Sequence, residues 1–167
     1  MVLKPSPHTL IDTANLSESD AAAVLARARA FQVAGLSGPL PPLLRGKHLA
    51  VLCDAPDDAD AAAFEQAALA LGAQVSRVHP DFSPISGAAV VQQTARLLGR
   101  LYDAVDCVGM TPAQVRWIRA TAGIPVFDGL AAPGHPTAAL VHGLAGGLGG
   151  AGQREWVIQA VLAWVLT

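Results

Sequence analysis

The sequence is poor in charge, in cysteine and in long apolar runs, and these shortages exclude several classes of protein. Only 14% of its 167 residues are charged and the net charge is −2, with no run of lysine or arginine, so nothing favours nucleic acid as a partner. No apolar stretch reaches the roughly 18–20 residues of a membrane span. Residues 1–16 lack the apolar core of a signal peptide. We therefore expect a cytoplasmic protein with no nucleic-acid or membrane partner.

The chain does have enough apolar material for one folded domain. Hydrophobic residues make up 52% of it, and 167 residues can bury a substantial core. Its two cysteines, Cys53 and Cys107, lie in apolar, strand-like runs. We interpret them as buried free thiols, in preference to a disulfide or a metal-binding pair.

The stretch from 48 to 73 is the most informative part of the chain. The apolar run Leu49–Leu52 predicts a buried strand, and the alanine-rich run Ala61–Leu71 predicts a helix that stops at Gly72. A helix that starts just after a strand is a ready-made anion site, because its first turn offers unpaired N–H groups and a positive dipole end. Here that turn is acidic instead, since it contains Asp57, Asp58 and Asp60.

Strands and helices alternate along the chain, which predicts an α/β fold: three layers, with a mainly parallel sheet of about four strands flanked by helices, in a single domain. The expected strands are 49–52, 74–78, 104–108 and 124–127. The expected helices follow Asp20, span 61–71, 88–102 and 112–122, begin at His135–Pro136, and end the chain at 154–166. Ligands in such folds usually bind at the carboxyl ends of the strands. We therefore expect a cleft there.

Four blocks of the sequence together resemble the N-terminal, carbamoyl-phosphate-binding domain of ornithine and aspartate carbamoyltransferases. They are LLRGKHLAVL with Phe64-Glu65 after it, TARLLGRLYDA, IPVFDGL, and His135-Pro136. They occur in the family's order and span roughly residues 8–145. The resemblance implies a parallel α/β sheet, carbamoyl transfer in amino-acid metabolism, and assembly around a threefold axis.

The departures from the family pattern fall on the residues that would hold carbamoyl phosphate. The family's phosphate loop reads Ser-Thr-Arg-Thr-Arg, whereas Asp57-Asp58-Ala59-Asp60-Ala61 stands here. Val108 replaces a third arginine, and Ala138 replaces the glutamine of the family's His-Pro-Cys-Gln. Of that set, only His135 matches. The resemblance with these losses predicts that carbamoyl phosphate no longer binds.

The C-terminal region of the chain also departs from the family pattern. We divide residues 1–167 into a carbamoyltransferase N-terminal-like domain, a glycine-rich linker at 146–152 and a C-terminal helix at 153–167. The family's amino-acid-binding second domain is not found between them, and by analogy the terminal helix packs back onto the first domain. Trp156 and Trp164 share a face of that helix, either packed on the domain or anchoring an interface.

Two motifs have competing interpretations. The run Gly147–Gly152 matches G-x-G-x-x-G, but it follows a helix-like segment and too little chain remains for the acidic partner of a dinucleotide site. We interpret it as a linker and expect no cofactor. The acidic cluster could bind Mg²⁺ or Ca²⁺, but capping of a helix within a solvated acidic face is the better account, so we expect no metal. This acidic cluster comprises Asp54, Asp57, Asp58 and Asp60.

Three hypotheses for function follow. The first is a non-catalytic carbamoyltransferase-like domain that survives as an oligomerising or binding module, a trimer by analogy with the family. The second is an enzyme or small-molecule binder with a changed ligand in the acidic cleft, where no catalytic residue can be assigned. Its candidate ligand-binding residues are Asp57, Asp58, Asp60 and His135, although His135 could equally be a helix-start residue bonded to backbone. The third is a subunit that modulates a catalytic carbamoyltransferase chain.

Overall fold

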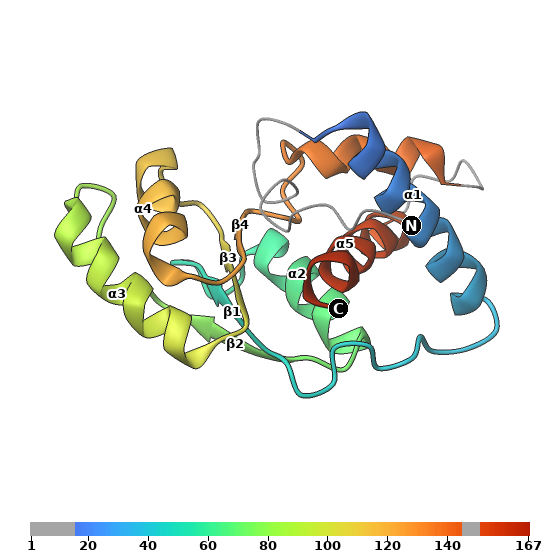
Figure 1. Ribbon diagram of the computed structural model, residues 1–167, viewed down its shortest axis with the longest axis horizontal. Coiled ribbons are helices and arrows are strands. Elements are labelled where there is room, and N and C mark those ends of the chain that lie inside the picture. The colour runs from blue at the N-terminus through green and yellow to red at the C-terminus, as the bar shows by residue number, and fades with distance from the viewer. Residues whose placement is uncertain (1–15, 145–150) are drawn as a thin grey trace.

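A computed structural model describes residues 16–144 and 151–167, which form a layered α/β fold around a parallel sheet (Figure 1). The strands are β1 (His48–Leu52), β2 (Gln74–Val78), β3 (Ala104–Cys107) and β4 (Val126–Asp128). They lie in the order β2-β1-β3-β4, and every neighbouring pair is parallel. The predicted fold class is confirmed.

The helices cover both faces of the sheet. One face carries α3 (Ala88–Leu101) and α4 (Pro112–Ala122), and the other carries α2 (Ala59–Ala70) and α5 (Ala151–Leu166), with α1 (Glu18–Gly35) and the 3-10 helix η1 (Pro136–Gly143) beyond (Figure 1). Covered on both faces, β1 and β3 are apolar almost throughout. Among the described residues, no helix has both the length and the apolar character to cross a bilayer.

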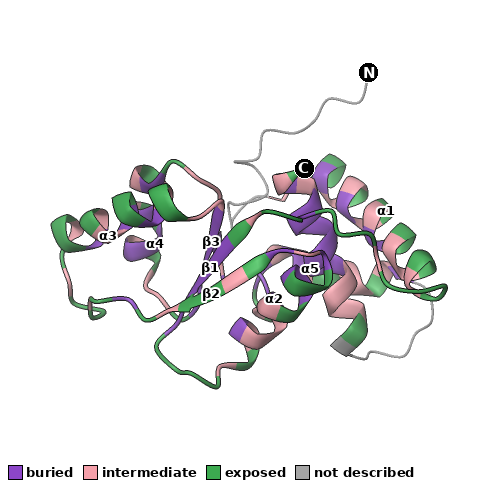
Figure 2. Cartoon of the chain, turned by 90° about the horizontal axis from the view of Figure 1, so that it is seen from below, coloured by how far each residue is buried: buried purple, intermediate pink, exposed green. Residues whose placement is uncertain are grey.

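Helix α5 is apolar around most of its circumference because it is packed on two sides. It lies between α1 and α2 (Figure 1), and its middle turns are buried (Figure 2). Both tryptophans of α5 face α1: a Cβ on Gly35 would collide with the Trp156 ring, and the Arg27 guanidinium lies 5.7 Å from the centre of the Trp164 ring. The C-terminal segment is therefore an integral part of this layer.

Several element boundaries differ from the expected ones. Strand β4 begins at Val126, after Pro125, which has no N–H to donate to a ladder. The segment after His135 is a 3-10 helix, and α5 begins at Ala151, before the predicted linker ends. The rest of that linker, 146–150, lies outside the described residues. Both cysteines are buried and free, as predicted.

Candidate functional site at the carboxyl edge of the sheet

The candidate cleft lies where the chain changes direction across the sheet. From β1 the chain passes to β2 on one side, and it then returns to β3 on the other side of β1. Such a switch point leaves a crevice beyond the carboxyl ends of the two strands, where α/β proteins usually bind ligands. Three parts of the chain border this edge: the turn before α2, the segment after β4, and the start of α5.

The N-terminus of α2 is closed by the protein's own carboxylate. Oδ1 of Asp58 accepts hydrogen bonds from the backbone N–H groups of Asp60 and Ala61, each at 2.9 Å. Asp58 is in the extended conformation of an N-cap residue, with φ −61° and ψ 125°. The prediction that an aspartate caps this helix is confirmed, and the N–H groups that could cradle an anion already have an acceptor.

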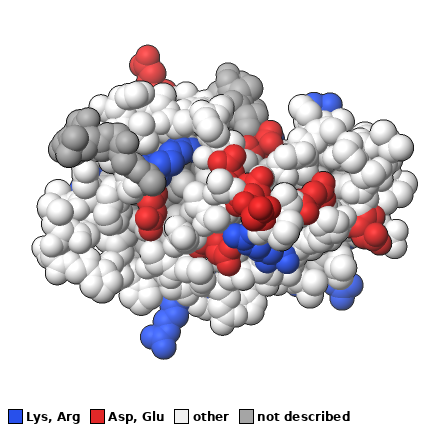
Figure 3. All heavy atoms as spheres, turned by 180° about the vertical axis from the view of Figure 1, so that it is seen from behind, with Lys and Arg blue, Asp and Glu red and all other residues white. Residues whose placement is uncertain are grey.

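The two other predicted aspartates lie beside this cap with different exposure. Asp57 is exposed, and Asp60 is half-buried in the first turn of α2. Acidic side chains gather near the middle of one face of the molecule, with few basic ones among them (Figure 3). Within residues 16–144 and 151–167, no three His, Cys, Asp or Glu side chains are arranged to hold a metal ion.

His135 is buried in a polar network after β4. Its Nδ1 accepts a hydrogen bond from the backbone N–H of Thr137 at 3.3 Å and lies 2.9 Å from Thr137 Oγ1. With Nδ1 as an acceptor, the proton of the neutral ring is on Nε2. Burial, followed by the charges of Arg154 and Arg119, lowers the pKa of His135 to about 4. His135 is therefore neutral at pH 7.

Arg154 connects α5 to this segment. Its guanidinium donates one hydrogen bond to Thr137 Oγ1 at 3.1 Å and another to the carbonyl of Leu130. Burial lowers its pKa to about 10, and the charge of Asp60 opposes that shift. Arg154 is thus still cationic at pH 7, and its charge interacts with both Asp60 and His135.

Asp106 is a buried carboxyl group in β3, one residue before the carboxyl end of the strand. It is 0% exposed, and its Oδ1 accepts a hydrogen bond from the N–H of Leu130 at 3.1 Å. Burial raises its pKa to about 7, although backbone hydrogen bonds from Leu130 and Gly129 partly offset the shift. Asp106 Oδ2 and His135 Nε2 are both buried and have no hydrogen-bond partner among the described residues.

The structure brings some of the predicted site residues together and leaves others apart. Asp58 and Asp60 share one helix start, and Arg154 couples Asp60 electrostatically to His135. Asp57 is exposed. Asp106 and Arg154 were missed by sequence reasoning, although a single aspartate within the apolar strand AVDCV is a detectable sign of a buried carboxyl group.

A family model decides the relationship of this fold to known proteins. The model described as the aspartate/ornithine carbamoyltransferase carbamoyl-P binding domain matches residues 8–145. The chain belongs to this family. The resemblance inferred from the four sequence blocks is thereby confirmed, over the same residues.

Individual carbamoyltransferases agree with this assignment. The chain is 34% identical over 128 residues to the ornithine carbamoyltransferase of Actinobacillus pleuropneumoniae serotype 5b, covering 77% of this chain and 38% of that protein. For the enzyme of Cutibacterium acnes the identity is 33% over 135 residues, covering 81% and 40%. The chain thus spans well under half the length of the curated relatives it matches.

Solved structures show the same fold. The ornithine carbamoyltransferase from Pyrococcus furiosus superposes with a TM-score of 0.58 at 27% identity, covering 66% of this chain and 35% of that one. An aspartate transcarbamoylase from Trypanosoma cruzi, solved in complex with phosphate, gives a TM-score of 0.66 at 22% identity, covering 80% and 42%. At that identity the second likeness concerns the fold alone.

Two further positions of this carbamoyltransferase-like domain matter for ligand binding. Val108, where the family pattern places an arginine, is 9% exposed and packs in the core on the α2 side of the sheet. Ala138, where the pattern places a glutamine, lies in η1 after Thr137. Neither side chain can donate a hydrogen bond to a ligand.

Proposed function

We propose that this domain is a carbamoyltransferase-like module that does not bind carbamoyl phosphate and acts by binding or oligomerisation, without catalysis. The observation that carries the proposal is the capped start of α2. A phosphate at that position would have to displace the Asp58 carboxylate from the N–H groups of Asp60 and Ala61. It would also approach the carboxylates of Asp57 and Asp60.

Electrostatic magnitudes support this proposal. A charge-assisted contact between arginine and phosphate is worth roughly 1.5–3 kcal/mol. Alanine or valine stands at the three arginine positions of the family pattern, Ala59, Ala61 and Val108. The missing contacts amount to about 5 kcal/mol or more, which is a several-thousand-fold loss of affinity. Repulsion by the acidic turn would weaken phosphate binding further.

The remaining polar groups do not replace these arginines. His135 is neutral at pH 7, so its Nε2–H could donate a hydrogen bond but brings no charge. Arg154 is cationic, but it already donates to Thr137 and Leu130 and is balanced by Asp60. One engaged arginine beside a cluster of carboxylates is a poor site for a phosphate monoester.

Calorimetric titration with carbamoyl phosphate and with inorganic phosphate tests this proposal. We expect no saturable binding to the native domain up to about 10 mM. The variant D57S/D58T/A59R/D60T, which places the family's polar residues and its first arginine at the start of α2, should gain measurable phosphate binding. Ala59 is exposed, so the arginine can be accommodated.

The variant D57S/D58T/D60T is the matched control, because it removes the same three carboxylates without adding the arginine. It separates relief of repulsion from the gain of a cationic contact, and it should bind phosphate more weakly than the arginine variant. Saturable micromolar binding of carbamoyl phosphate to the native domain would overturn the proposal, and so would citrulline formation from carbamoyl phosphate and ornithine.

The oligomerising role requires its own measurement. By analogy with the family we propose a homotrimer, which light scattering coupled to gel filtration would report as about three times the mass of one chain. A monomeric mass at all accessible concentrations would contradict the proposed homotrimer. Association with a catalytic carbamoyltransferase chain, visible as a mixed peak after co-expression, would favour a modulatory subunit.

A cytoplasmic location suits the two free cysteines, because thiols stay reduced there.

One observation favours a second candidate function, a small-molecule binder with a changed ligand. Asp106 Oδ2 and His135 Nε2 are buried without a partner among the described residues, at the edge where α/β folds bind ligands. The acidic turn would suit a cationic or polyhydroxy compound. A thermal-shift screen of such compounds tests it: a hit should be lost in D57N/D58N, whereas unchanged binding in that variant would exclude these aspartates.

A further inference from the structure

A pocket lies at the opposite end of α2 from the acidic turn. Its cavity volume is about 350 Å³, which is within the range of small-ligand sites. It is formed where the C-terminal end of α1 meets the C-terminal end of α2 and the first half of α5. The residues that line it are Gly35, Gly38, Pro39, Leu40, Ala70, Glu155, Trp156 and Gln159.

The charges and dipoles around this pocket all favour a cation. Helices α1 and α2 both end at it, with Gly35 and Ala70, and the C-terminal end of a helix carries the negative pole of its dipole. Neither helix has a basic residue in its last turn. Glu155 adds a carboxylate, and none of the described lining residues is basic.

A buried, unpartnered oxygen provides independent evidence of a site. Gln159 is 1% exposed and lines the pocket, and its Nε2 donates a hydrogen bond to Glu155 Oε1 at 3.0 Å. This bond fixes the orientation of the amide, because the flipped amide would place oxygen against oxygen. Gln159 Oε1 is then buried with no hydrogen-bond partner among the described residues. Such an acceptor is costly unless a donor meets it.

The aromatic wall of the pocket suits a cation that carries apolar groups. The Trp156 ring rests against Gly35, where any Cβ would collide with it, so the indole is held at the pocket by the α1–α5 contact. Indole rings attract cations through their π-electrons, and methylated ammonium groups fit such rings well. A small metal ion would use neither this ring nor the apolar lining.

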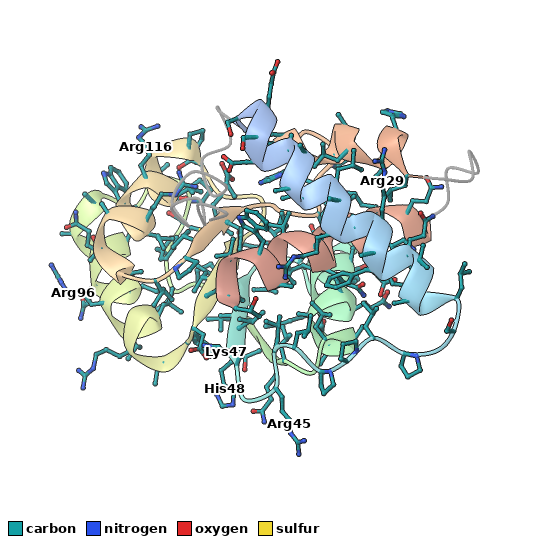
Figure 4. All side chains as sticks on the ribbon, turned by 45° about the vertical axis from the view of Figure 1, so that its right-hand side comes forward. Arg29, Arg45, Lys47, His48, Arg96 and Arg116 are labelled. Atoms are coloured by element: carbon teal, nitrogen blue, oxygen red, sulfur yellow. The ribbon has the colours of Figure 1, made fainter. Side chains whose placement is uncertain are left out.

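The basic side chains near α5 are directed elsewhere. Arg154 donates to Thr137 and to Leu130, and Arg29 of α1 donates to the carbonyl of Gly143. Arg96 and Arg116 extend from α3 and α4, on the other side of the sheet (Figure 4). No cation of the protein occupies the place that an ammonium ligand would take, as far as the described residues show.

We propose that this pocket binds a small organic ammonium ion, with Glu155 as the charged contact, Gln159 Oε1 as the acceptor for a hydroxyl or N–H proton of the ligand, and Trp156 as the aromatic contact. The probe is choline, titrated into the ¹⁵N-labelled full chain at constant ionic strength, and the readout is the indole N–H resonance of Trp156. The neutral control is 3,3-dimethyl-1-butanol, which has the shape of choline without its charge. Trp117 and Trp164 serve as internal references.

We expect choline to shift the Trp156 resonance saturably, with an affinity at least about tenfold higher than that of the neutral alcohol. Glu155→Gln should weaken choline binding about tenfold, and Gln159→Met should weaken it severalfold. Glu18→Gln, which removes an equal charge at the far end of α1, should leave it unchanged. Equal shifts from choline and the alcohol in the native protein would overturn the proposal, and so would equal effects of Glu155→Gln and Glu18→Gln.

Discussion

The two sides of the candidate cleft are built in opposite ways. On the α2 side, Asp57 and Asp58 belong to an exposed or half-exposed turn, and their contacts are local to the start of one helix. On the β4 side, His135, Thr137 and Arg154 form a largely buried network that joins η1, α5 and the segment after β4. One side is a short surface feature, and the other is part of the core.

This difference explains how the charge of such a cleft can reverse while the fold is maintained. Substitution in an exposed turn usually changes stability by less than about 0.5 kcal/mol, unless a cap is lost, and Asp58 supplies a cap. Removal of one member of a buried polar network leaves the others without partners, at a cost of about 1–3 kcal/mol or more. Apart from the Asp58 cap, the acidic turn can therefore change at little cost in stability, whereas changes in the buried network are expected to destabilise the fold.

The largest expected effect comes from Arg154→Met. This change removes both hydrogen bonds from α5 to Thr137 and Leu130 and leaves buried acceptors without donors, so we expect a loss of about 3 kcal/mol in the free energy of unfolding. Urea denaturation measures it. Arg116→Met, at an exposed position of α4, is the control. Equal losses of unfolding free energy in the two variants would show that the hydrogen bonds of Arg154 do not contribute to stability.

The next effect is a pH dependence centred on Asp106. Its pKa is raised to about 7 in the folded state, so between about pH 4 and 7 the folded protein binds more protons than the unfolded chain, and stability falls as pH rises. Asp106→Asn keeps an acceptor for the Leu130 N–H and removes this titration. As the pH rises from 5 to 8, the free energy of unfolding of the variant should increase by about 2–3 kcal/mol relative to that of the native domain.

The titration of His135 has the opposite effect on stability, and this effect can be measured in the same variant. Its pKa is lowered to about 4 in the folded state, so stability falls as pH drops from about 6.5 towards 4. In the native domain the two slopes largely cancel over that range. Asp106→Asn should therefore lose stability on acidification from pH 6.5 to 5. A flat profile in the variant would contradict the buried, neutral state of His135.

A smaller effect is expected at the α2 cap. Asp58→Ala removes the acceptor of two backbone N–H groups and should cost about 1 kcal/mol. Asp58→Asn retains an acceptor oxygen and should restore most of the loss. Asp57→Ala, one residue earlier and exposed, should change the midpoint of thermal unfolding very little. A loss at position 57 as large as that at 58 would show that charge, and not capping, stabilises this turn.

The sequence predicts the fold well because the fold depends on local patterns. The apolar runs of β1 and β3, the Asp58 cap and the Thr111-Pro112 helix start each report their own structure. The buried network was not predicted, because it joins residues as distant as Asp106, His135 and Arg154, and no local period records such contacts. The pocket lined by Glu155, Trp156 and Gln159 likewise depends on three helix segments that meet only in the folded chain.

The smallest expected effect concerns the tie between the acidic turn and the sheet edge. Arg77 of β2 donates to Glu65 Oε2 at 2.7 Å and to the carbonyl of Pro56, so it holds the turn against α2 and β2. Both side chains of the ion pair are nearly a third exposed, and such pairs contribute about 0–1 kcal/mol. Arg77→Gln should therefore cost about 0.5 kcal/mol, and less at high salt, because screening weakens an exposed pair.

Arg45→Gln, at an exposed arginine near the start of β1 (Figure 4), is the matched control. A loss above about 2 kcal/mol at Arg77 would mean that the turn is anchored as firmly as the buried side of the cleft, and the contrast between the two sides would fail.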